Sequence, residues 1–327
     1  MITMKEIAQE CGISSATVSK IINGNDEHIS EATRALVLQT IKKYNYVPNA
    51  VAKGLKVKRT NTIGFILPDI SNPFFPEIAR GVEDAAESCG FAVTFCDTDN
   101  DPKRELTSFQ LLRSKMVDGV IFTRTLRHSS FDDYLSVNLP IVVVDRRVET
   151  TNRNVGKLFV DTFHASRQAT EHLIARGCRR IGFIGAANDY DDVRYLGYCS
   201  ALEEAGLRVE DALCYKSDYS VETGHRGMKA IISAGMPDGV FCGNDLIAVG
   251  AMAEIHSMGF TIPTDVRVVG FDDIYLSRYL RPALTTVRQP AYDMGFEAAK
   301  MLISHITEGT PLCTLKMKHE LIIREST

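Results

Sequence analysis

The sequence predicts a small all-helical head followed by a large α/β body of two lobes, each built on a doubly wound parallel sheet. Three observations predict this architecture. The 327 residues are too many for one ordinary core, the first sixty have helical periodicity, and from Thr62 onward short apolar runs alternate with helical stretches. We expect residues 1–47 to form the head, 48–60 a hinge helix and linker, and 61–327 the body.

Composition excludes several classes of protein. The chain is 45% hydrophobic and 24% charged, and no apolar run reaches the roughly 18 residues that a membrane helix needs. Its start shows no signal-peptide pattern. The eight cysteines are scattered, without a CxxC pair or a metal-like cluster. We therefore expect a cytoplasmic protein with free thiols, no membrane contact, no bound metal and no cofactor.

Charge is distributed unevenly along the chain. The net charge is −4, yet residues 1–59 carry nine Lys or Arg and five Asp or Glu. Residues 41–60 contain six basic side chains and no acidic one. A basic head on an acidic body is typical of a polyanion-binding module, although a solvated basic linker would give the same charge.

The head begins with two short helices. Thr3 and Glu6 have the spacing of a capping box, which predicts a helix over Met4–Glu10 with Ile7 and Ala8 on its inner face. Gly12 suits a sharp turn, after which Ser14 can cap a second helix. Two short helices around a glycine turn are the helix-turn-helix pattern, and an ordinary helical hairpin is the alternative.

The second and third helices complete this small core. Apolar positions of the second helix are Ala16 or Thr17, Val18, Ile21 and Ile22. Ser30 can cap a third helix through "EATRALVLQTIKKYNY". We expect its inner side to carry Leu36, Val37, Ile41 and Tyr44.

In a helix-turn-helix the second helix lies in the major groove of DNA. Small side chains at its start allow close approach, so Ala16 is placed to meet a thymine methyl group. Lys20, one turn later, can donate to guanine or to a phosphate, and Thr17 and Ser19 suit phosphate contacts.

The stretch "YVPNAVAKGLKVKRT" follows the head. Pro48 can open a helix over Asn49–Lys56 with Ala52 and Leu55 on one face, too short to be stable alone in water. Leu55 between Lys53 and Lys56 suits a wedge inserted into the minor groove. The alternative is a disordered linker, which is also what we expect without DNA.

The body contains seven strand-like runs, and polar residues follow several of them. The runs are "TIGFILP", "FAVTFCD", "DGVIFT", "PIVVVD", "RIGFIG", "DGVFCG" and "VRVVGFD". Parallel sheets bind ligands at the carboxyl ends of their strands, which here carry Asp69, Asp145, Gly185, Asn244 and Asp272. We expect an N-lobe of about 61–160 and 290–321, a C-lobe of about 161–289, and a cleft between them.

The body contains no catalytic pattern. No GxSxG, Walker, HExxH or GxGxxG motif occurs, and the eight histidines are dispersed. The paired acids Asp272 and Asp273 are explained by a strand end followed by a helix cap. We therefore expect no catalytic residues and no enzyme.

Several motifs together resemble the lactose-repressor (LacI/GalR) family of bacterial transcriptional regulators. They are "TMKEIAQECGISSATVSKIING", "YVPNAVAKGLKV", "NTIGFILPDISNPFF", "VDGVIF", "EHLIARGCRRIGFIG", "FCGNDLIAVGAM", "VVGFDD" and "LTTVRQP". The resemblance covers essentially the whole chain. It implies a homodimer that binds a pseudo-palindromic operator, with Leu55 of each subunit at the central base step. The residues expected at DNA are Thr3, Ser14, Ser15, Ala16, Thr17, Ser19, Lys20, Asn23, Ala52, Leu55 and Lys56.

The body also resembles periplasmic sugar-binding proteins, especially those for ribose. The positions that match their sugar-binding residues are Asn72, Phe74, Phe75, Asp145, Arg146, Arg194, Tyr219, Asn244, Asp272 and Gln289. Aromatic rings pack on the C–H faces of sugars, while Asp and Arg bond adjacent hydroxyls. The alternatives are that Phe74 and Phe75 belong to the core, that Arg194 pairs with Asp191 or Asp192, and that Asp272 caps a helix. Tyr219 stands where those proteins have Phe.

The resemblance implies an allosteric repressor controlled by a small-molecule effector, a sugar, with ribose or a related pentose as the first candidate. One alternative is a catabolite-control regulator activated by a phosphorylated carrier protein, with its effector surface on the N-lobe. Another is a solute-binding transport protein, against which the helix-turn-helix head argues. The chain ends at "LIIREST" without a heptad-like tail, so we expect a dimer rather than a tetramer.

Overall fold

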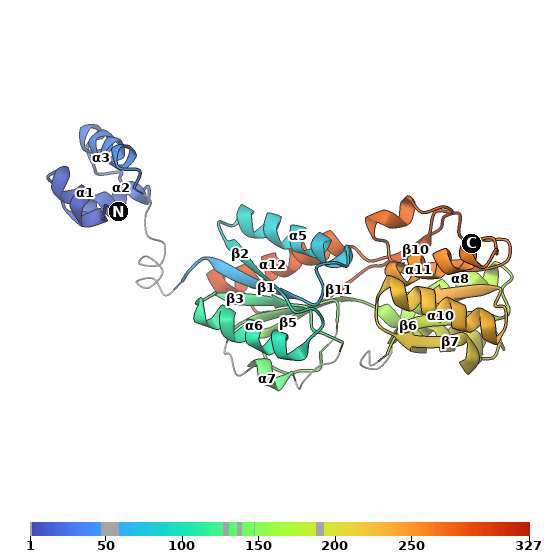
Figure 1. The fold of residues 1–327 in the computed structure, drawn as a ribbon. Coiled ribbons are helices and arrows are strands. Elements are labelled where there is room, and N and C mark those ends of the chain that lie inside the picture. The colour runs from blue at the N-terminus through green and yellow to red at the C-terminus, as the bar shows by residue number, and fades with distance from the viewer. Residues whose placement is uncertain (1, 47–58, 127–130, 136–138, 147, 188–192) are drawn as a thin grey trace. The chain divides into compact units, whose positions relative to one another are not determined.

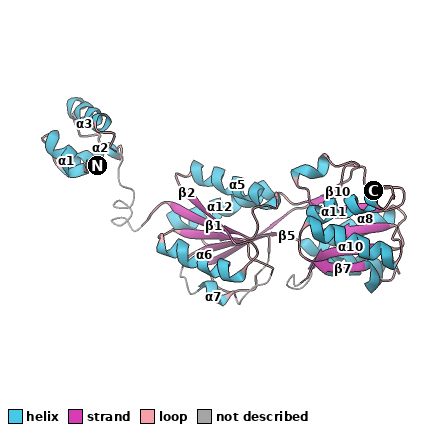
Figure 2. Cartoon of the chain, viewed as in Figure 1, coloured by secondary structure: helices cyan, strands magenta, loops and turns pink. Residues whose placement is uncertain are grey.

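The computed structural model describes residues 2–46, 59–126, 131–135, 139–146, 148–187 and 193–327 (Figure 1). The chain forms two compact units, Met1–Thr60 and Asn61–Thr327. The first unit is helical and the second combines helices with two sheets, as the colouring by secondary structure shows (Figure 2). The predicted fold class is confirmed.

The three predicted helices of the first unit are present, and each starts at the predicted cap. They are α1 (Met4–Glu10), α2 (Ser15–Ile22) and α3 (Glu31–Lys43). Thr3 and Glu6 form the reciprocal capping box, and the side chains of Ser14 and Ser30 accept the N–H groups of Thr17 and Thr33. Gly12 has a φ of +66°, the left-handed geometry that the turn between α1 and α2 requires.

The core of this unit is small, and one detail of it differs from the prediction. Its buried side chains are Ile7, Ala8, Cys11, Val18, Ile21 and Val37. Leu36 and Tyr44, predicted on the inner side of α3, are 46% and 40% exposed. Three short helices can cover only a narrow stripe of α3, and Val37 and Thr40 occupy it. The hydroxyl of Tyr44 instead donates to Glu10, 3.0 Å away.

The second unit contains two six-stranded sheets. The N-lobe sheet has the order β11-β5-β4-β3-β1-β2, formed by β1 (Thr62–Leu67), β2 (Ala92–Asp97), β3 (Gly119–Phe122), β4 (Ile141–Val144), β5 (Val155–Val160) and β11 (Thr314–Met317). The C-lobe sheet has the order β12-β10-β9-β8-β6-β7, formed by β6 (Ile181–Ala186), β7 (Cys214–Ser217), β8 (Gly239–Cys242), β9 (Arg267–Asp272), β10 (Thr285–Arg288) and β12 (Glu320–Ile322).

The seven predicted runs coincide with β1, β2, β3, β4, β6, β8 and β9. The strands that the prediction omitted are β5, β7, β10, β11 and β12. Most of them are short and mixed in polarity, as "CYKS", "TTVR" and "TLKM" show, so they lack the apolar run on which the prediction relied. Among the described strands, only β12 pairs antiparallel, with β10. The other pairings described in the two sheets are parallel, as predicted.

Helices cover both sheets. Those of the N-lobe are α5 (Phe74–Ser88), α6 (Pro102–Ser114), α7 (Asp132–Leu135) and α12 (Ala291–Glu308). Those of the C-lobe are α8 (Thr162–Ala175), α9 (Val193–Glu204), α10 (Val221–Ala234) and α11 (Asp245–Ser257), with short 3-10 turns η2 (Asp211–Leu213) and η3 (Tyr275–Arg278). No helix of the described residues is both long and apolar enough to cross a membrane.

The chain passes between the lobes three times. It leaves the N-lobe after β5, returns between β10 and α12, and leaves again between β11 and β12. The last passage comes slightly before the expected boundary at about residue 321. The final residues bind the C-lobe because Ser326 donates to the carbonyl oxygen of Val268 at 2.6 Å.

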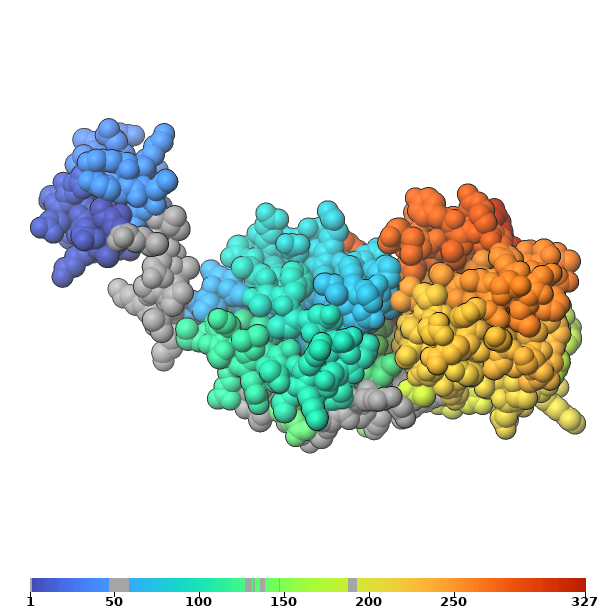
Figure 3. Space-filling model, viewed as in Figure 1, coloured from blue at the N-terminus to red at the C-terminus, as the bar shows by residue number. Residues whose placement is uncertain are grey.

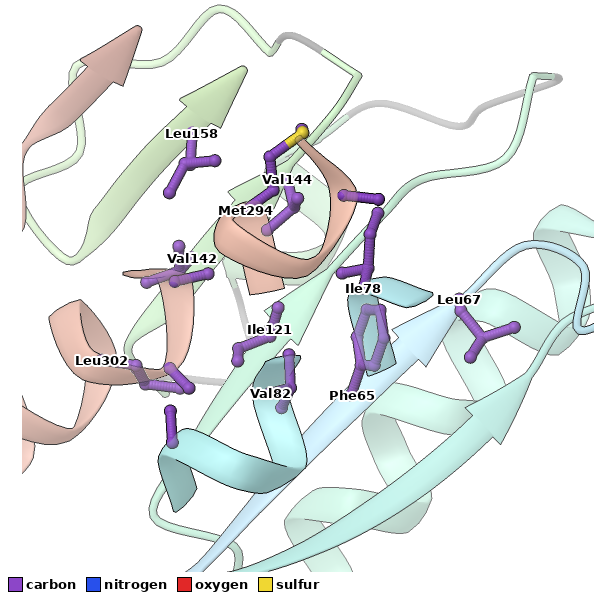
Figure 4. Close-up of a cluster of buried hydrophobic side chains, with 14 of the residues drawn as sticks. Phe65, Leu67, Ile78, Val82, Ile121, Val142, Val144, Leu158, Met294 and Leu302 are labelled. Carbon is purple, nitrogen blue, oxygen red and sulfur yellow. The ribbon is translucent and has the colours of Figure 1, made fainter. Parts of the chain in front are cut away.

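The main N-lobe core lies between the sheet and the helices α5 and α12. Figure 4 shows its side chains, among them Phe65 and Ile121 of the sheet, Ile78 of α5 and Met294 of α12. The two helices are in close contact, because a Cβ atom on Gly81 would lie 2.0 Å from the carbonyl oxygen of Tyr292.

The two lobes also touch each other. Ile274 of the C-lobe belongs to the N-lobe core cluster. In the space-filling view, cyan and green N-lobe residues meet yellow and orange C-lobe residues (Figure 3).

Candidate effector site and DNA-binding helix

The exposed face of α2 carries three of the residues expected at DNA. Ser15, Ala16 and Lys20 are exposed, whereas Val18 and Ile21 are buried in the core. A helix face with small side chains and one cation suits entry into the major groove of DNA. Thr17 and Ser19 lie at the edges of this face, where both are half-buried.

Other predicted DNA contacts also hold the head together. The hydroxyl and N–H of Thr3 donate to Glu6 at 2.8 and 2.7 Å, and the Ser14 and Thr17 hydroxyls lie 2.9 Å apart. The amide of Asn23 donates to the carbonyl oxygen of Ser19 at 2.6 Å. The side chains of Thr3, Ser14 and Asn23 are exposed, so capping leaves them accessible to a phosphate. The predicted hinge residues Ala52, Leu55 and Lys56 lie outside the described residues.

In the second unit, one cavity of about 780 Å³ gathers most of the predicted effector residues. Nine of the ten line it, namely Asn72, Phe74, Phe75, Asp145, Arg146, Arg194, Tyr219, Asn244 and Asp272. The tenth, Gln289, is buried behind Asp272 and donates to Asp272 Oδ1 at 2.9 Å. Most of these residues lie at carboxyl ends of strands or at the starts of helices, where parallel sheets place ligands.

The N-lobe contributes two phenylalanines and an arginine to the cavity. Phe74 and Phe75 begin α5 and meet edge to face, with ring centres 5.3 Å apart. The guanidinium of Arg146 lies 5.8 Å from the Phe75 ring centre and 3.9 Å from the carboxylate of Asp145. Its Nη1 donates to the carbonyl oxygen of Arg124 at 2.5 Å. Both a flat apolar face and fixed hydrogen-bond donors are therefore available to a ligand.

The C-lobe contributes a second arginine–carboxylate pair. Arg194 Nη2 lies 3.6 Å from Asp272 Oδ1. The guanidinium is 4.4 Å from the ring centre of Phe271 and 4.8 Å from that of Tyr219, so it has two cation–π contacts. This pairing with Asp272 is an ion pair across the fold rather than a local one, and Asp191 and Asp192 lie outside the described residues. Asp272 does not cap the 3-10 turn η3 that follows it, because the N-cap of η3 is Ile274.

Burial alters the acidity of the C-lobe carboxyls. Burial raises the pKa of Asp272 to about 8, against the attraction of Arg194. Burial also raises the pKa of Asp245 to about 7, although three donors lower it, namely the hydroxyls of Ser277 and Thr286 and the N–H of Ile274. Among the described residues no group of three or more His, Cys, Asp or Glu side chains could hold a metal ion.

The cavity wall also includes residues that the sequence interpretation missed. They include Arg124, Glu149, Lys157, Phe159, Asp161, Phe163 and Thr314. Two of them, Lys157 and Phe159, are on β5, which was not predicted. The alternation in "VGKLFV" is the signal that could have placed both on one face.

Asp161 lies where the chain first passes between the lobes. Its carboxylate accepts hydrogen bonds from Lys316 and pairs with His164 Nδ1 at 2.9 Å. Burial raises the pKa of Asp161, but these bonds outweigh burial and hold the pKa well below its usual range. The side chain is therefore an anion on the side of the cavity where the chain passes between the lobes.

Comparisons with known proteins agree with both halves of this description. Residues 3–49 match the family of bacterial regulatory proteins of the lacI type, and residues 170–327 match the periplasmic binding protein-like domain. The chain is 37% identical to the ribose operon repressor of Halalkalibacterium halodurans over 332 residues, covering 100% of this chain and 97% of the relative.

Two solved structures are similar in fold and sequence. The transcriptional regulator CelR in complex with cellobiose has a TM-score of 0.75 and 29% identity and covers 100% of both chains. A LacI-family regulator from Enterococcus faecium with bound ribose has a TM-score of 0.73 and 26% identity, covering 81% of this chain and 98% of that one. These relatives are named as regulators rather than enzymes.

Proposed function

The chain belongs to the LacI family of bacterial regulatory proteins, and we propose that it is a cytoplasmic repressor whose operator binding is controlled by a sugar, ribose or a related pentose first. The relative named as a ribose operon repressor and the enterococcal regulator with bound ribose support this choice. In this proposal residues 1–47 bind the operator, 48–60 form the hinge, and 61–327 bind the effector and form the dimer.

The observation that carries the proposal is the composition of the cavity. Each lobe contributes one arginine beside one aspartate, Arg146 with Asp145 and Arg194 with Asp272. Each lobe also contributes aromatic rings, Phe74 and Phe75 from one and Tyr219 from the other. Adjacent sugar hydroxyls can bond to such charged pairs while the C–H faces of the ring pack on aromatic carbon.

In this proposal one small sugar contacts both sets of residues, which line the same cavity, and so favours a closed arrangement of the lobes. A ligand then stabilises the closed arrangement by its difference in affinity for the two states. If the closed and open states bind the operator with different affinities, the sugar changes operator affinity by the same factor by which the operator changes sugar affinity. We propose that the sugar acts as an inducer and releases the operator.

On DNA, we propose a homodimer that places one α2 in the major groove of each operator half-site. Lys20 and Ala16 would contact bases, with Leu55 of each subunit at the central step. The exposed start of α2 supports the first contact.

The test is calorimetric titration of the purified protein with ribose, other pentoses, hexoses, gluconate and purines, followed by operator binding with and without the ligand. We expect micromolar binding of one pentose and weaker operator binding in its presence. Lys20→Ala should weaken operator binding and leave sugar affinity unchanged. Binding of no sugar in the panel would contradict the sugar effector and favour a protein partner.

A further inference from the structure

A buried glutamate outside the cavity lies close to one of its arginines. Glu105, in the first turns of α6, is fully buried. Its Oε2 accepts the backbone N–H of Thr125 at 2.6 Å, and its Oε1 accepts the hydroxyl of Tyr134. Burying a carboxylate is costly unless its oxygens are hydrogen-bonded, so both bonds are needed to keep Glu105 in place.

Glu105 accepts its backbone hydrogen bond from the peptide group that joins Arg124 to Thr125. The N–H of Thr125 and the carbonyl of Arg124 belong to the same planar peptide, and in a trans peptide they point in opposite directions. On the carbonyl side, Arg146 Nη1 donates to this oxygen at 2.5 Å. The peptide between residues 124 and 125 is therefore held by a carboxylate on one side and by a guanidinium on the other.

Charge strengthens this arrangement. Hydrogen bonds to ionised groups are stronger than neutral ones, and bonds in series polarise one another. Burial raises the pKa of Glu105, while the bonds from Tyr134 and Thr125 and the positive charge of Arg146 oppose that rise. The ring of Tyr134 is itself fixed, because it stacks on Phe109 with ring centres 4.9 Å apart.

We propose that Glu105 is a positioning residue for the effector site: through the peptide between Arg124 and Thr125 it holds the guanidinium of Arg146 in the cavity. Without the acceptor at Glu105, this peptide can rotate and the carbonyl that anchors Arg146 moves with it. The consequence for sugar affinity rests on the proposed function, whereas the effect on Arg146 does not.

The variants Glu105→Met and Glu105→Gln form a matched pair. Both side chains have nearly the length of glutamate, but only glutamine keeps an oxygen that accepts the N–H of Thr125. The first measurement is made without ligand, on the full chain with labelled arginine, and follows the Nε–H signal of Arg146 by NMR. Its assignment comes from the signal that disappears in Arg146→Met.

We expect Glu105→Met to shift and broaden the Arg146 signal and to speed its hydrogen exchange, and Glu105→Gln to preserve it. An Arg146 signal that is unchanged in Glu105→Met, or equally altered in both variants, overturns the proposal. Glu254→Ala is the control, because Glu254 is another buried glutamate, on α11 of the C-lobe. It should leave the Arg146 signal unchanged even if it lowers the melting temperature.

The second measurement is D-ribose affinity by calorimetry. Glu105→Met should weaken binding about tenfold, the effect of losing roughly one charge-assisted bond. In an Arg146→Met background the same change should have almost no further effect, because the guanidinium through which Glu105 acts on the sugar is already absent. If the losses in ribose affinity of the two single variants add in the double variant, the link through Arg146 is overturned. If the wild-type chain binds no ribose, the sugar assignment fails while the NMR result still decides the role of Glu105.

Discussion

The two lobes present similar chemistry to the cavity but hold their arginines differently. In the N-lobe, Arg146 is anchored by a backbone carbonyl and is 3.9 Å from its carboxylate partner. In the C-lobe, Arg194 lies against two aromatic rings and is 3.6 Å from Asp272, a carboxyl buried to 5% exposure. The N-lobe arginine therefore depends on backbone geometry, and the C-lobe arginine depends on side-chain packing around a buried acid.

This difference predicts unequal losses on substitution, of which Arg194→Ala should cause the largest. Removing the cation deletes a hydrogen-bond donor that lines the cavity and leaves the buried Asp272 without its charged partner, although Gln289 still donates to Asp272. We expect D-ribose affinity to fall at least about 100-fold by calorimetry, with operator binding retained. Arg281→Ala, an exposed arginine of the same lobe, should have no effect. An unaltered sugar response in Arg194→Ala would place the effector site elsewhere.

Arg146→Met should cause a smaller loss, about tenfold. Its partner carbonyl, that of Arg124, lies beside the cavity, where water can replace the lost donor. The measurement is the same calorimetric titration. A loss larger than that of Arg194→Ala would reverse the comparison between the lobes.

The buried acids of the C-lobe also predict a dependence of stability on pH. The folded-state pKa of Asp245, about 7, is above its ordinary value near 4, so the folded chain holds a proton that the unfolded chain releases. The free energy of unfolding therefore falls as the pH rises from about 4 to about 7. We expect the melting temperature of the ligand-free protein to fall between pH 5 and pH 8.

Asp245→Asn should reduce this dependence, because the amide does not titrate, while Asp272, whose pKa burial raises to about 8, keeps its own contribution. Asp265→Asn is the control, since Asp265 is exposed and accepts a local N–H from Thr261. Equal slopes for wild type and Asp245→Asn would assign the pH dependence to other groups.

Tyr219→Phe should give the smallest effect, no more than about threefold in ribose affinity. The ring that faces Arg194 at 4.8 Å is retained and only the hydroxyl is lost. Tyr219→Ala removes the ring and should weaken binding about tenfold. If the phenylalanine variant lost as much as the alanine variant, the hydroxyl rather than the ring would be the contact.

Much of the fold was predictable because its signals are local. The caps Thr3, Ser14 and Ser30 accept hydrogen bonds from N–H groups three residues away. The apolar strands of the body are recognisable from their composition. Nine of the ten proposed effector residues line one cavity, and the family resemblance, rather than spacing, selected them.

The remaining features depended on contacts between distant parts of the chain. Leu36 and Tyr44 belong to an apolar pattern, yet the narrow core of three short helices leaves them exposed. Glu105 and Arg146 are linked by a peptide that neither belongs to. Asp161 is kept ionised with the help of Lys316, 155 residues later in the chain, whose hydrogen bond lowers the pKa of the carboxyl.

Residue types and their spacing thus sufficed for the helix-turn-helix, its caps and the alternation of strands and helices, whereas the family resemblance supplied the class of regulator. Folding alone brought Arg194 to Asp272, placed Asp161 at the cavity and connected Glu105 to Arg146. The reason is physical: a cap or a strand is stabilised by neighbours in the chain, whereas the orientation of a buried charge is set by whichever distant groups satisfy it.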